Sequence, residues 1–473
     1  MLKTWDIFDT LIARRCIFPV NVFKIIQDSN KMEGFVEARL IAERNLALLG
    51  NNYNLDDIYN ELNKISDLSD DNCNILKNIE CQVEIEQAIP ITENILQVKA
   101  GDILISDMYL PEEIIRKMLE KCGLIVPVEI VVTSGGKSSG RVWKQIADQN
   151  EFVFHIGDSK NNDIKNSRLA GFDSALTILN LPNQVENYFL NQDFNFAAYL
   201  REIRLRNPYQ EGIKKLYWEF FTFNIAILII FVQLIDDLQK KGNFEYLGFC
   251  GRDTYYLWLL YKKFKEDKNE IPTPSDYLQY SRKILFNSEM EVAEYFSDRI
   301  GGRKALMIDL VGSGMGLNKL RNYMKADYSI LMCNCYNTKN IENWTALDTM
   351  PEISPENKNF YFTSFNHSAD ILEFLNRATH NTPIKIQNVK IGEKIVPKIF
   401  FSEVNDSENL DVMLKCLSEV LKSSINWGGT GENAFKTLEE LIPFGINWVR
   451  PMIFRENHHL TEIMDKEFTF KWN

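Results

Sequence analysis

The chain has 473 residues, which is too long for one ordinary hydrophobic core and predicts two domains. Its hydrophobic content of 45% and charged content of 25% are typical of soluble globular proteins. The net charge of -12 argues against a nucleic acid partner, because nucleic-acid-binding surfaces are usually basic. The 8 cysteines lack a metal-ligand spacing, and no basic segment precedes an apolar stretch at the N-terminus. We therefore expect a cytoplasmic protein with reduced cysteines and no secretory signal.

The first eleven residues carry the strongest chemical signal. Asp6 ends a short apolar strand, and Thr10 follows at the head of a loop. A carboxylate in this position can attack phosphorus and form an aspartyl-phosphate, provided that Mg²⁺ neutralises the phosphoryl oxygens. The pattern indicates phosphoryl chemistry at the first strand.

Further polar residues follow later strands in chain order. Ser106 ends an apolar strand, and Lys137 lies in a Gly/Ser-rich loop before a helical pattern. Asp158 follows another apolar strand, and Asp163 comes after a tight turn. Each of these residues lies at the end of a predicted strand or in the loop or turn that follows it.

In this order the motifs resemble those of the haloacid dehalogenase (HAD) superfamily. The resemblance implies a Rossmann-like parallel α/β domain with a phosphatase site. It implies that Asp6 is the nucleophile, that Ser106 hydrogen-bonds the transferring phosphoryl group, and that Lys137 offsets charge between the two.

The resemblance also implies the metal site and exposes one departure. Asp158, Asp6 and the Phe8 carbonyl would hold Mg²⁺, with Asp163 as a supporting carboxylate of the same site. Most HAD phosphatases carry a general acid two residues after the nucleophile, where this chain has Phe8. Asp9 follows one residue later, and two interpretations stay open: a displaced general acid or a cap on the loop. Dehalogenases, phosphonatases and HAD domains of bacterial surface-polysaccharide loci also lack the second Asp.

The first domain is predicted over residues 1–195. Residues 15–95, between the first two motifs, have a mostly helical pattern, clearest at 37–44, and resemble a helical cap. The basic segment 201–208 is interpreted as the connection to the second domain. The apolar run 220–232 is too short for an ordinary membrane span and predicts a buried helix. Contact with a membrane surface is the alternative for this run.

The second domain, residues 209–473, is predicted to be another parallel α/β sheet, because strand candidates alternate with helical patterns. One strand candidate contains Asp309 and leads into a glycine-rich loop that opens a helix. Such a loop lets backbone N–H groups approach an anion. The loop residues expected to bind phosphate are Gly312, Ser313, Gly314 and Gly316.

This loop resembles the phosphoribosyl-pyrophosphate (PRPP) loop of phosphoribosyltransferases. The resemblance implies that the loop binds the 5-phosphate and that Asp309 reaches the ribose hydroxyls. The family usually has two adjacent acids, but here Ile308 replaces the first. The earlier Arg252-Asp253 pair stands where a pyrophosphate loop is expected, with Asp253 as a catalytic candidate.

Other residues have two interpretations. Arg282 and Lys283 would clamp pyrophosphate or lie at a solvated strand end. Glu373 would bind acceptor hydroxyls or face solvent, and we favour solvent. Core packing is favoured over sugar stacking for Trp427, Trp448 and Phe454, and His367 is expected to be an ordinary loop residue.

Together the two halves resemble bifunctional enzymes that add ribofuranose to bacterial capsule or O-antigen glycans. This implies transfer of 5-phosphoribose from PRPP to a glycan acceptor, which is lipid-linked in some systems, and then removal of the 5-phosphate with Mg²⁺. It also implies a cytoplasmic location, at the inner face of the membrane where the acceptor is lipid-linked. Three alternatives remain: a phosphatase with a non-catalytic phosphate-binding domain, a nucleotide-salvage phosphoribosyltransferase, and a non-enzymatic scaffold.

Overall fold

The computed structural model describes residues 2–49, 52–150, 152–324, 326–335, 344–346, 360–365, 370–378, 380–403, 410–428 and 434–456. The chain divides into two compact units, Met1–Gln210 and Glu211–Asn473. Each unit has its own parallel sheet, so the expected α/β class is confirmed. The first unit extends past residue 195, where the first domain was predicted to end.

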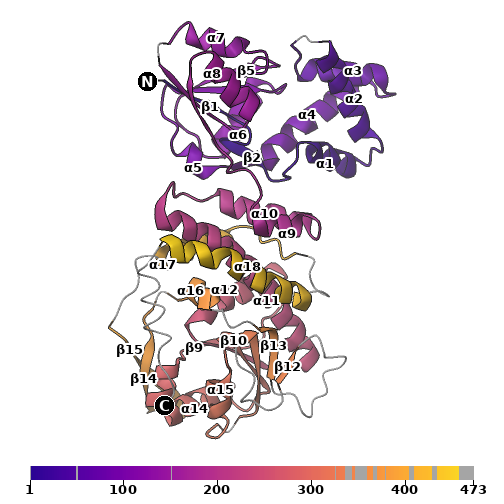
Figure 1. The fold of residues 1–473 in the computed structure, drawn as a ribbon. Coiled ribbons are helices and arrows are strands. Elements are labelled where there is room, and N and C mark those ends of the chain that lie inside the picture. Colours follow the sequence, from indigo (N-terminus) through magenta and orange to yellow (C-terminus); the bar gives the residue numbers. More distant parts are fainter. Residues whose placement is uncertain are drawn as a thin grey trace. The chain divides into compact units, whose positions relative to one another are not determined.

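The sheet of the first unit has five parallel strands with β1 in the middle (Figure 1). Its order is β5 (Glu129–Thr133), β4 (Ile103–Asp107), β1 (Leu2–Asp6), β6 (Val153–Gly157) and β7 (Asp173–Leu176). The chain moves from β1 to one side of the sheet and later returns to the other. The neighbours of β1 are therefore β4 and β6, and their carboxyl ends flank the switch point where α/β proteins usually bind ligands.

Outside the helical insertion described below, the helices of this unit connect the strands or follow the last one. They are α5 (Thr92–Ile95), α6 (Glu112–Lys121), α7 (Arg141–Ala147), the π-helical turn η1 (Lys160–Lys165), α8 (Asn166–Leu169), α9 (Gln184–Leu190) and α10 (Phe194–Leu205). Trp5 and Trp143 are fully buried.

A helical insertion separates β1 from β4, as the sequence predicts. It leaves the core through β2 (Ile12–Arg14) and returns through β3 (Ala88–Pro90), which pair antiparallel. Between them lie α1 (Val20–Asn30), α2 (Phe35–Leu48), α3 (Leu55–Ile65) and α4 (Asp70–Gln87). Two buried ion pairs hold the insertion together: Arg39 with Glu80 at 2.8 Å, and Arg14 of the stem with Glu84 at 2.8 Å.

The basic segment 201–208, interpreted as a connection, is mostly helix, and that interpretation was wrong for its first part. Residues up to Leu205 belong to α10, whose arginines are buried against the first unit. Arg204 binds Glu186 and the Leu179 carbonyl, and Arg201 binds the Asn180 and Arg14 carbonyls at 2.9 and 3.0 Å. The two arginines lie three residues apart in α10, and both donate to backbone carbonyls of the first unit. Their positive charge therefore helps to hold α10 on that unit and does not mark a linker.

The second unit contains a six-stranded parallel sheet. Its order is β12 (Trp344–Ala346), β13 (Phe360–Phe365), β11 (Tyr328–Cys335), β10 (Ala305–Gly312), β8 (Tyr246–Cys250) and β9 (Ser275–Leu278). Strands β10 and β11 are almost wholly buried, as expected for central parallel strands.

The described helices of this unit are α11 (Gly212–Gly242), the 3₁₀ turn η2 (Arg252–Thr254), α12 (Tyr255–Asp267), α13 (Arg282–Asn287), α14 (Glu289–Ile300), α15 (Met315–Leu320), α16 (Asp370–Leu375), α17 (Leu410–Lys422) and α18 (Ala434–Glu456). A separate antiparallel hairpin consists of β14 (Pro383–Ile391) and β15 (Lys394–Phe401).

The apolar run 220–232 lies in the middle of α11. Among the described residues, α11 is the one helix long and apolar enough to cross a membrane, and 89% of its apolar window is buried inside the protein. The expected buried helix is confirmed, and packing accounts for its composition.

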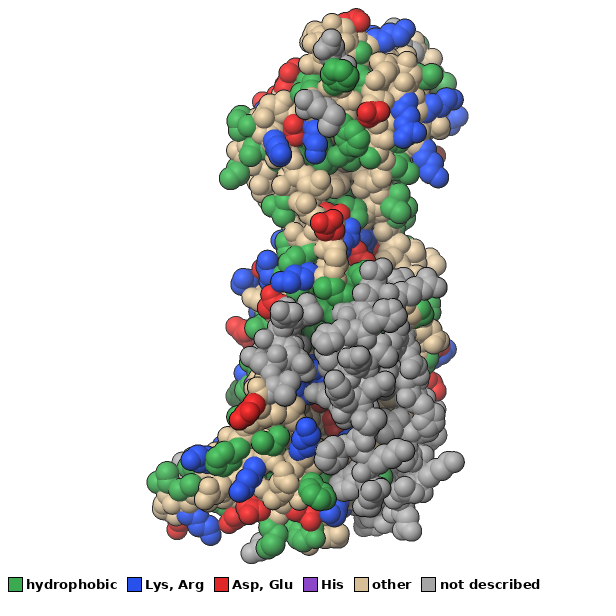
Figure 2. Space-filling model, turned by 60° about the vertical axis from the view of Figure 1, so that its left-hand side comes forward, with side chains coloured by type: hydrophobic (Ala, Val, Ile, Leu, Met, Phe, Trp, Pro, Cys, Tyr) green, Lys and Arg blue, Asp and Glu red, His purple; other side chains and the backbone are tan. Residues whose placement is uncertain are grey.

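Figure 2 shows Lys and Arg side chains interspersed with Asp and Glu on the face in view, with hydrophobic side chains scattered among them. The acidic side chains in the coloured part of that face are thus not gathered into one field.

Candidate active site

The site lies at the carboxyl ends of the three central strands of the first unit. Asp6 is the last residue of β1, Ser106 and Asp107 end β4, and Asp158 directly follows β6. Parallel pairing aligns these ends, with Trp5 opposite Leu104 and Ile156. The backbone register brings together residues that are about 150 positions apart in the sequence.

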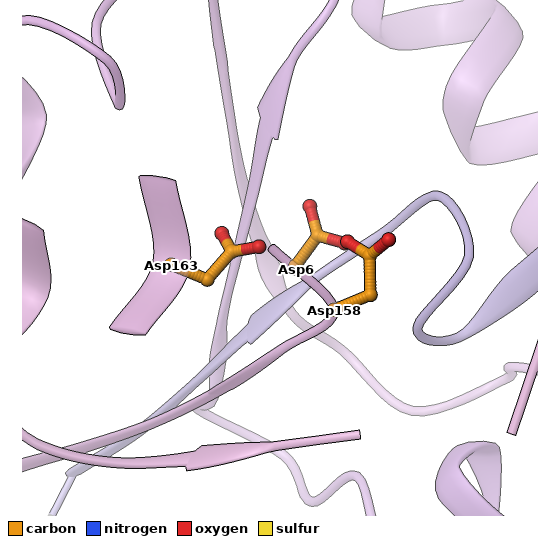
Figure 3. Close-up of side chains that lie close together, drawn as sticks. All are labelled: Asp6, Asp158 and Asp163. Carbon is orange, nitrogen blue, oxygen red and sulfur yellow. The ribbon is translucent and has the colours of Figure 1, made fainter. Parts of the chain in front are cut away.

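Three carboxylates converge at this edge. Oxygen atoms of Asp6, Asp158 and Asp163 all lie within 4.8 Å of one another. Figure 3 shows the Asp6 and Asp158 carboxylates close together, with the Asp163 carboxylate turned toward them from η1. Asp6 and Asp163 are buried and Asp158 is half-buried. A group of oxygen ligands this compact suits a small divalent cation.

Lys137 links two of these carboxylates. Lys137 is 97% buried, and its ammonium donates to Asp6 Oδ1, and to Asp163 Oδ1 at 2.8 Å. Burial opposes the charge of Lys137, but the two carboxylates outweigh burial and hold the pKa of Lys137 above its ordinary value. Lys137 is therefore a permanent cation beside the predicted nucleophile.

The other ionisable groups of the cluster are carboxylates, and they repel one another. Burial raises the pKa of Asp6 to about 6; Lys137 and a 2.8 Å hydrogen bond from Thr10 oppose the rise, while Asp163 adds to it. Burial, followed by the charges of Asp6, Asp9 and Asp163, raises the pKa of Asp158 to about 7. A divalent cation would relieve this repulsion and favour the ionised carboxylates.

Asp163 is held mainly by the protein itself. Its Oδ2 accepts from the Ser159 N–H at 2.9 Å, and His155 lies 3.4 Å from its Oδ1. Burial lowers the pKa of His155 to about 4, so its imidazole is neutral. A Cβ on Gly157 would collide with the Asp163 carboxylate, which explains the glycine at the end of β6. These bonds suit Asp163 to positioning Lys137, and His155 was missed by the sequence argument because a strand histidine carries no motif.

Asp107 is a second residue that the sequence argument missed. Its carboxylate accepts from the N–H groups of Gly136 at 2.9 Å and Lys137 at 3.2 Å, and from the Thr133 hydroxyl. Asp107 therefore fixes the backbone of the loop that carries Lys137. Its neighbour Ser106 is 98% buried. A position directly after a strand-end serine could have signalled this role.

Phe8 and Asp9 form a tight turn after Asp6. Asp9 has φ 60°, and its N–H donates to the Ile12 carbonyl at 2.6 Å. The Phe8 carbonyl accepts no hydrogen bond from the described residues and so keeps its capacity to bind a cation. The Asp9 carboxylate lies 4.0 Å from Arg201 and contributes to the raised pKa of Asp158. Both interpretations of Asp9 remain compatible with this position.

A pocket of about 450 Å³ lies beside the site, between the α2–α3 loop of the insertion and the ends of β4 and β5. Its walls are residues 52–57, 108–112 and 132–134. Arg141 donates to Asn52 at 2.8 Å, and the Leu55 N–H donates to the Tyr109 carbonyl at 3.0 Å. The insertion is thereby held against the rim of the site, where it can exclude water.

The second unit brings together some of the residues predicted there. Asp253 in η2 accepts from the Val311 N–H at 3.3 Å, next to Asp309 on β10. Burial, then the charges of Asp309 and Glu373, hold the pKa of Asp253 well above its ordinary value. Burial and Glu373 raise the pKa of Asp309 to about 8, against a smaller opposing effect of Arg282. Glu373 is half-buried and its charge acts on both carboxylates, and its role, acceptor binding or facing solvent, stays a prediction.

The glycine-rich loop has packing reasons for its composition. Gly314 has φ 66°, a Cβ on Gly312 would lie 2.9 Å from the Met332 methyl, and a Cβ on Gly316 would overlap the Tyr280 hydroxyl. The helix that follows, α15, has 6 residues.

The other residues that the sequence suggested for ligand binding in the second unit lie in several elements of that unit. Ser313 is half-buried in the loop, and Arg252 is half-buried with its carbonyl accepting from the Ala378 N–H. Arg282 and Lys283 begin α13 with exposed side chains, so the expected strand end there is a helix start. Trp427 packs on Phe264 and Trp448 on Phe220, and both tryptophans are half-buried. His367 and the Phe454 side chain lie outside the described residues.

No protein-family model matches the chain, and no curated protein matches it with significant sequence similarity.

Proposed function

We propose that the first unit is a Mg²⁺-dependent phosphomonoesterase of the HAD type, with Asp6 as the nucleophile. The observation that carries this proposal is the buried Asp6 carboxylate, held by Lys137 and Thr10 beside Asp158 at the carboxyl end of the central strand. A structural ion pair would not need the additional carboxylates, whose mutual repulsion is costly without a cation.

The residues fit a divalent cation. Asp6, Asp158 and the Phe8 carbonyl would hold it, because Asp163 already has Lys137, Ser159 and His155 as partners. When bound, the ion would supply charge neutralisation for the phosphoryl oxygens.

The protein groups then divide the reaction. Asp6 Oδ2, oriented by Thr10, attacks phosphorus, the bond from phosphorus to the ester oxygen breaks, and the alcohol leaves. Lys137 and Ser106 bind the phosphoryl oxygens, and water then attacks the aspartyl-phosphate and releases phosphate and free Asp6. Asp9 is the proposed donor of the proton that the leaving alcohol needs.

For the whole chain we propose the addition of ribofuranose to a bacterial surface glycan. The second unit would transfer 5-phosphoribose from PRPP with release of pyrophosphate, and the first unit would remove the 5-phosphate. What supports the transferase is the meeting of Asp253, Asp309 and Glu373 beside the glycine-rich loop. The glycan acceptor and the HAD and phosphoribosyltransferase assignments rest on the sequence motifs.

A second candidate is a phosphatase whose partner domain does no chemistry. It is favoured by the packing contacts at Gly312 and Gly316, which explain both glycines without a phosphate, and by the raised pKa of Asp309.

The two candidates separate in one assay on the full chain. The protein is incubated with PRPP, Mg²⁺ and candidate acceptor glycans, and pyrophosphate and phosphate are measured separately. We expect Asp6→Asn to abolish phosphate release, leave pyrophosphate release unchanged and accumulate a product that retains the phosphate. The exposed Asp28→Asn on α1 is the matched control.

Each outcome assigns one unit. Phosphate release that survives Asp6→Asn excludes the nucleophile. Phosphate release from simple phosphate esters without pyrophosphate release from any acceptor supports the second candidate.

A further inference from the structure

The hairpin β14–β15 has two faces of different chemistry. Side chains alternate between the faces of a strand, so the register assigns each residue to one of them. On the inner face Ile386 is buried, Asn388 donates to the Glu291 carbonyl at 2.8 Å, and Lys390 lies 3.6 Å from Glu294. The inner face is therefore committed to α14.

The strand positions of the outer face combine lysines with apolar side chains and include no acid, while the exposed Glu393 lies in the turn at the tip of the hairpin. Its paired positions are Lys385 with Phe400, Gln387 with Lys398, and Val389 with Val396, and Ile391 follows on the same face. Of its apolar side chains, Val389 is 45% exposed, Ile391 65%, Val396 46% and Phe400 36%. Lys398 lies 5.3 Å from the Phe400 ring, so charge and apolar surface are adjacent. Figure 1 shows the hairpin at the periphery of the second unit.

We propose that this outer face docks on an anionic lipid surface. An anionic bilayer accepts both components: aliphatic and aromatic side chains enter the interfacial region while lysines remain with the phosphate headgroups. A face whose strand positions include lysines and no acid is notable in a chain with 65 acidic and 53 basic residues, because the rest of the protein is repelled by such a surface. The hairpin would orient the protein with this face toward the lipid.

Other occupants fit less well. A second copy docking face to face would bring the lysines of one hairpin against those of the other, which like-charge repulsion disfavours. A nucleic acid would meet Val389, Ile391 and Val396 where stacking or hydrogen-bonding groups are needed.

Binding of the full chain to lipid vesicles can be measured without any enzymatic activity. The protein is co-sedimented with vesicles of phosphatidylcholine alone and with vesicles that contain phosphatidylglycerol. We expect binding to the anionic vesicles alone, and its loss when salt rises from low concentration to about 0.5 M. Each lysine near an anionic surface contributes roughly a factor of five, so Lys385→Glu with Lys398→Glu should weaken binding at least about 10-fold.

Two further variants separate charge from packing. Lys241→Glu with Lys436→Glu makes the same charge change at exposed positions of α11 and α18 and should retain at least half of the binding. Val389→Ser with Ile391→Ser should weaken binding without changing net charge. Thermal melts that match the parent exclude unfolding as the cause.

Three outcomes would overturn the proposal: equal binding to both kinds of vesicle, no vesicle binding, or equal losses in the hairpin and control lysine variants. A dimer in solution that the serine variant dissociates would instead assign the face to a second copy.

Discussion

Asp6 in the first unit and Asp309 in the second both lie near the carboxyl end of a central parallel strand, yet their surroundings differ. Asp6 accepts hydrogen bonds from the buried Lys137 and from the Thr10 hydroxyl. Its carboxylate also lies close to Asp158 and Asp163, in a group of oxygens that could hold a metal ion. Burial and the charge of Glu373 raise the pKa of Asp309 to about 8, against smaller opposing effects of a hydrogen bond from the Leu310 backbone and of the Arg282 charge.

The difference shows why similar strand-end motifs need not carry equal functional weight. In the first unit, the charge of Lys137 lowers the pKa of Asp6 against the effect of burial. With a pKa of about 6, the nucleophile is mostly ionised at neutral pH. In the second unit, burial and like charges keep Asp309 protonated, so it can donate a hydrogen bond to a ligand but contributes no negative charge.

Removing the buried cation should have the largest effect. Lys137→Met removes the charge that lowers the pKa of Asp6, so fewer nucleophiles are ionised at neutral pH. Phosphatase turnover should fall by roughly 10²–10³-fold, and the acid limb of the pH–rate profile should move to higher pH. The exposed Lys144→Met on α7 is the control. A profile that keeps its position would show that Lys137 does not set the ionisation of Asp6.

Asp9→Asn tests whether the first site has its own proton donor. Because Asn tolerates the left-handed backbone at φ 60°, the turn should survive. If Asp9 is the acid, turnover of an alkyl phosphate should fall on the order of 10²-fold, whereas an aryl phosphate with a good leaving group should be little affected. Equal losses on both substrates, or a lowered melting temperature with normal turnover, would remove Asp9 from proton transfer.

Asp107→Ala should have a smaller effect, because Asp107 acts through the loop that carries Lys137. Without this carboxylate the Gly136 and Lys137 N–H groups lose their acceptor. We expect turnover to fall about 10-fold and the Lys137 loop to exchange its amide hydrogens faster. Thr133→Val, which removes one donor to Asp107, should show a weaker version of both effects. Unchanged exchange in the loop would contradict the anchoring role.

Asp309→Asn should leave phosphatase turnover unchanged and act on stability alone. Asp309 has a folded pKa of about 8 and an ordinary value of 3.8, so between about pH 4 and pH 8 the folded protein holds a proton that the unfolded chain releases. The carboxyl group therefore lowers the free energy of unfolding progressively as pH rises through this window. The variant should gain little in melting temperature near pH 4 and more near pH 8, and the exposed Asp298→Asn should gain nothing at either pH. A pH-independent gain would show that Asp309 is ionised like an exposed acid.

The sequence alone determined much of the first site and the architecture. Asp6, Asp158 and Lys137 were predicted because each follows an apolar strand or lies in a Gly/Ser-rich loop, and these local signals are short-range. The strands β8, β10 and β11 and the buried helix α11 were predicted for the same reason, since continuous apolar runs indicate buried elements.

Only the tertiary structure decided which charges face each other. Asp107 and His155 have no motif, and their roles depend on hydrogen bonds to residues in other elements. Segment 201–208 resembles a linker in the sequence, but in the structure Arg201 and Arg204 donate to backbone carbonyls of the first unit. The pKa values of Asp6 and Asp309 depend on burial and on charges brought close by the sheet register. Those distances are set by packing across the whole unit, which the spacing of residues along the chain does not encode.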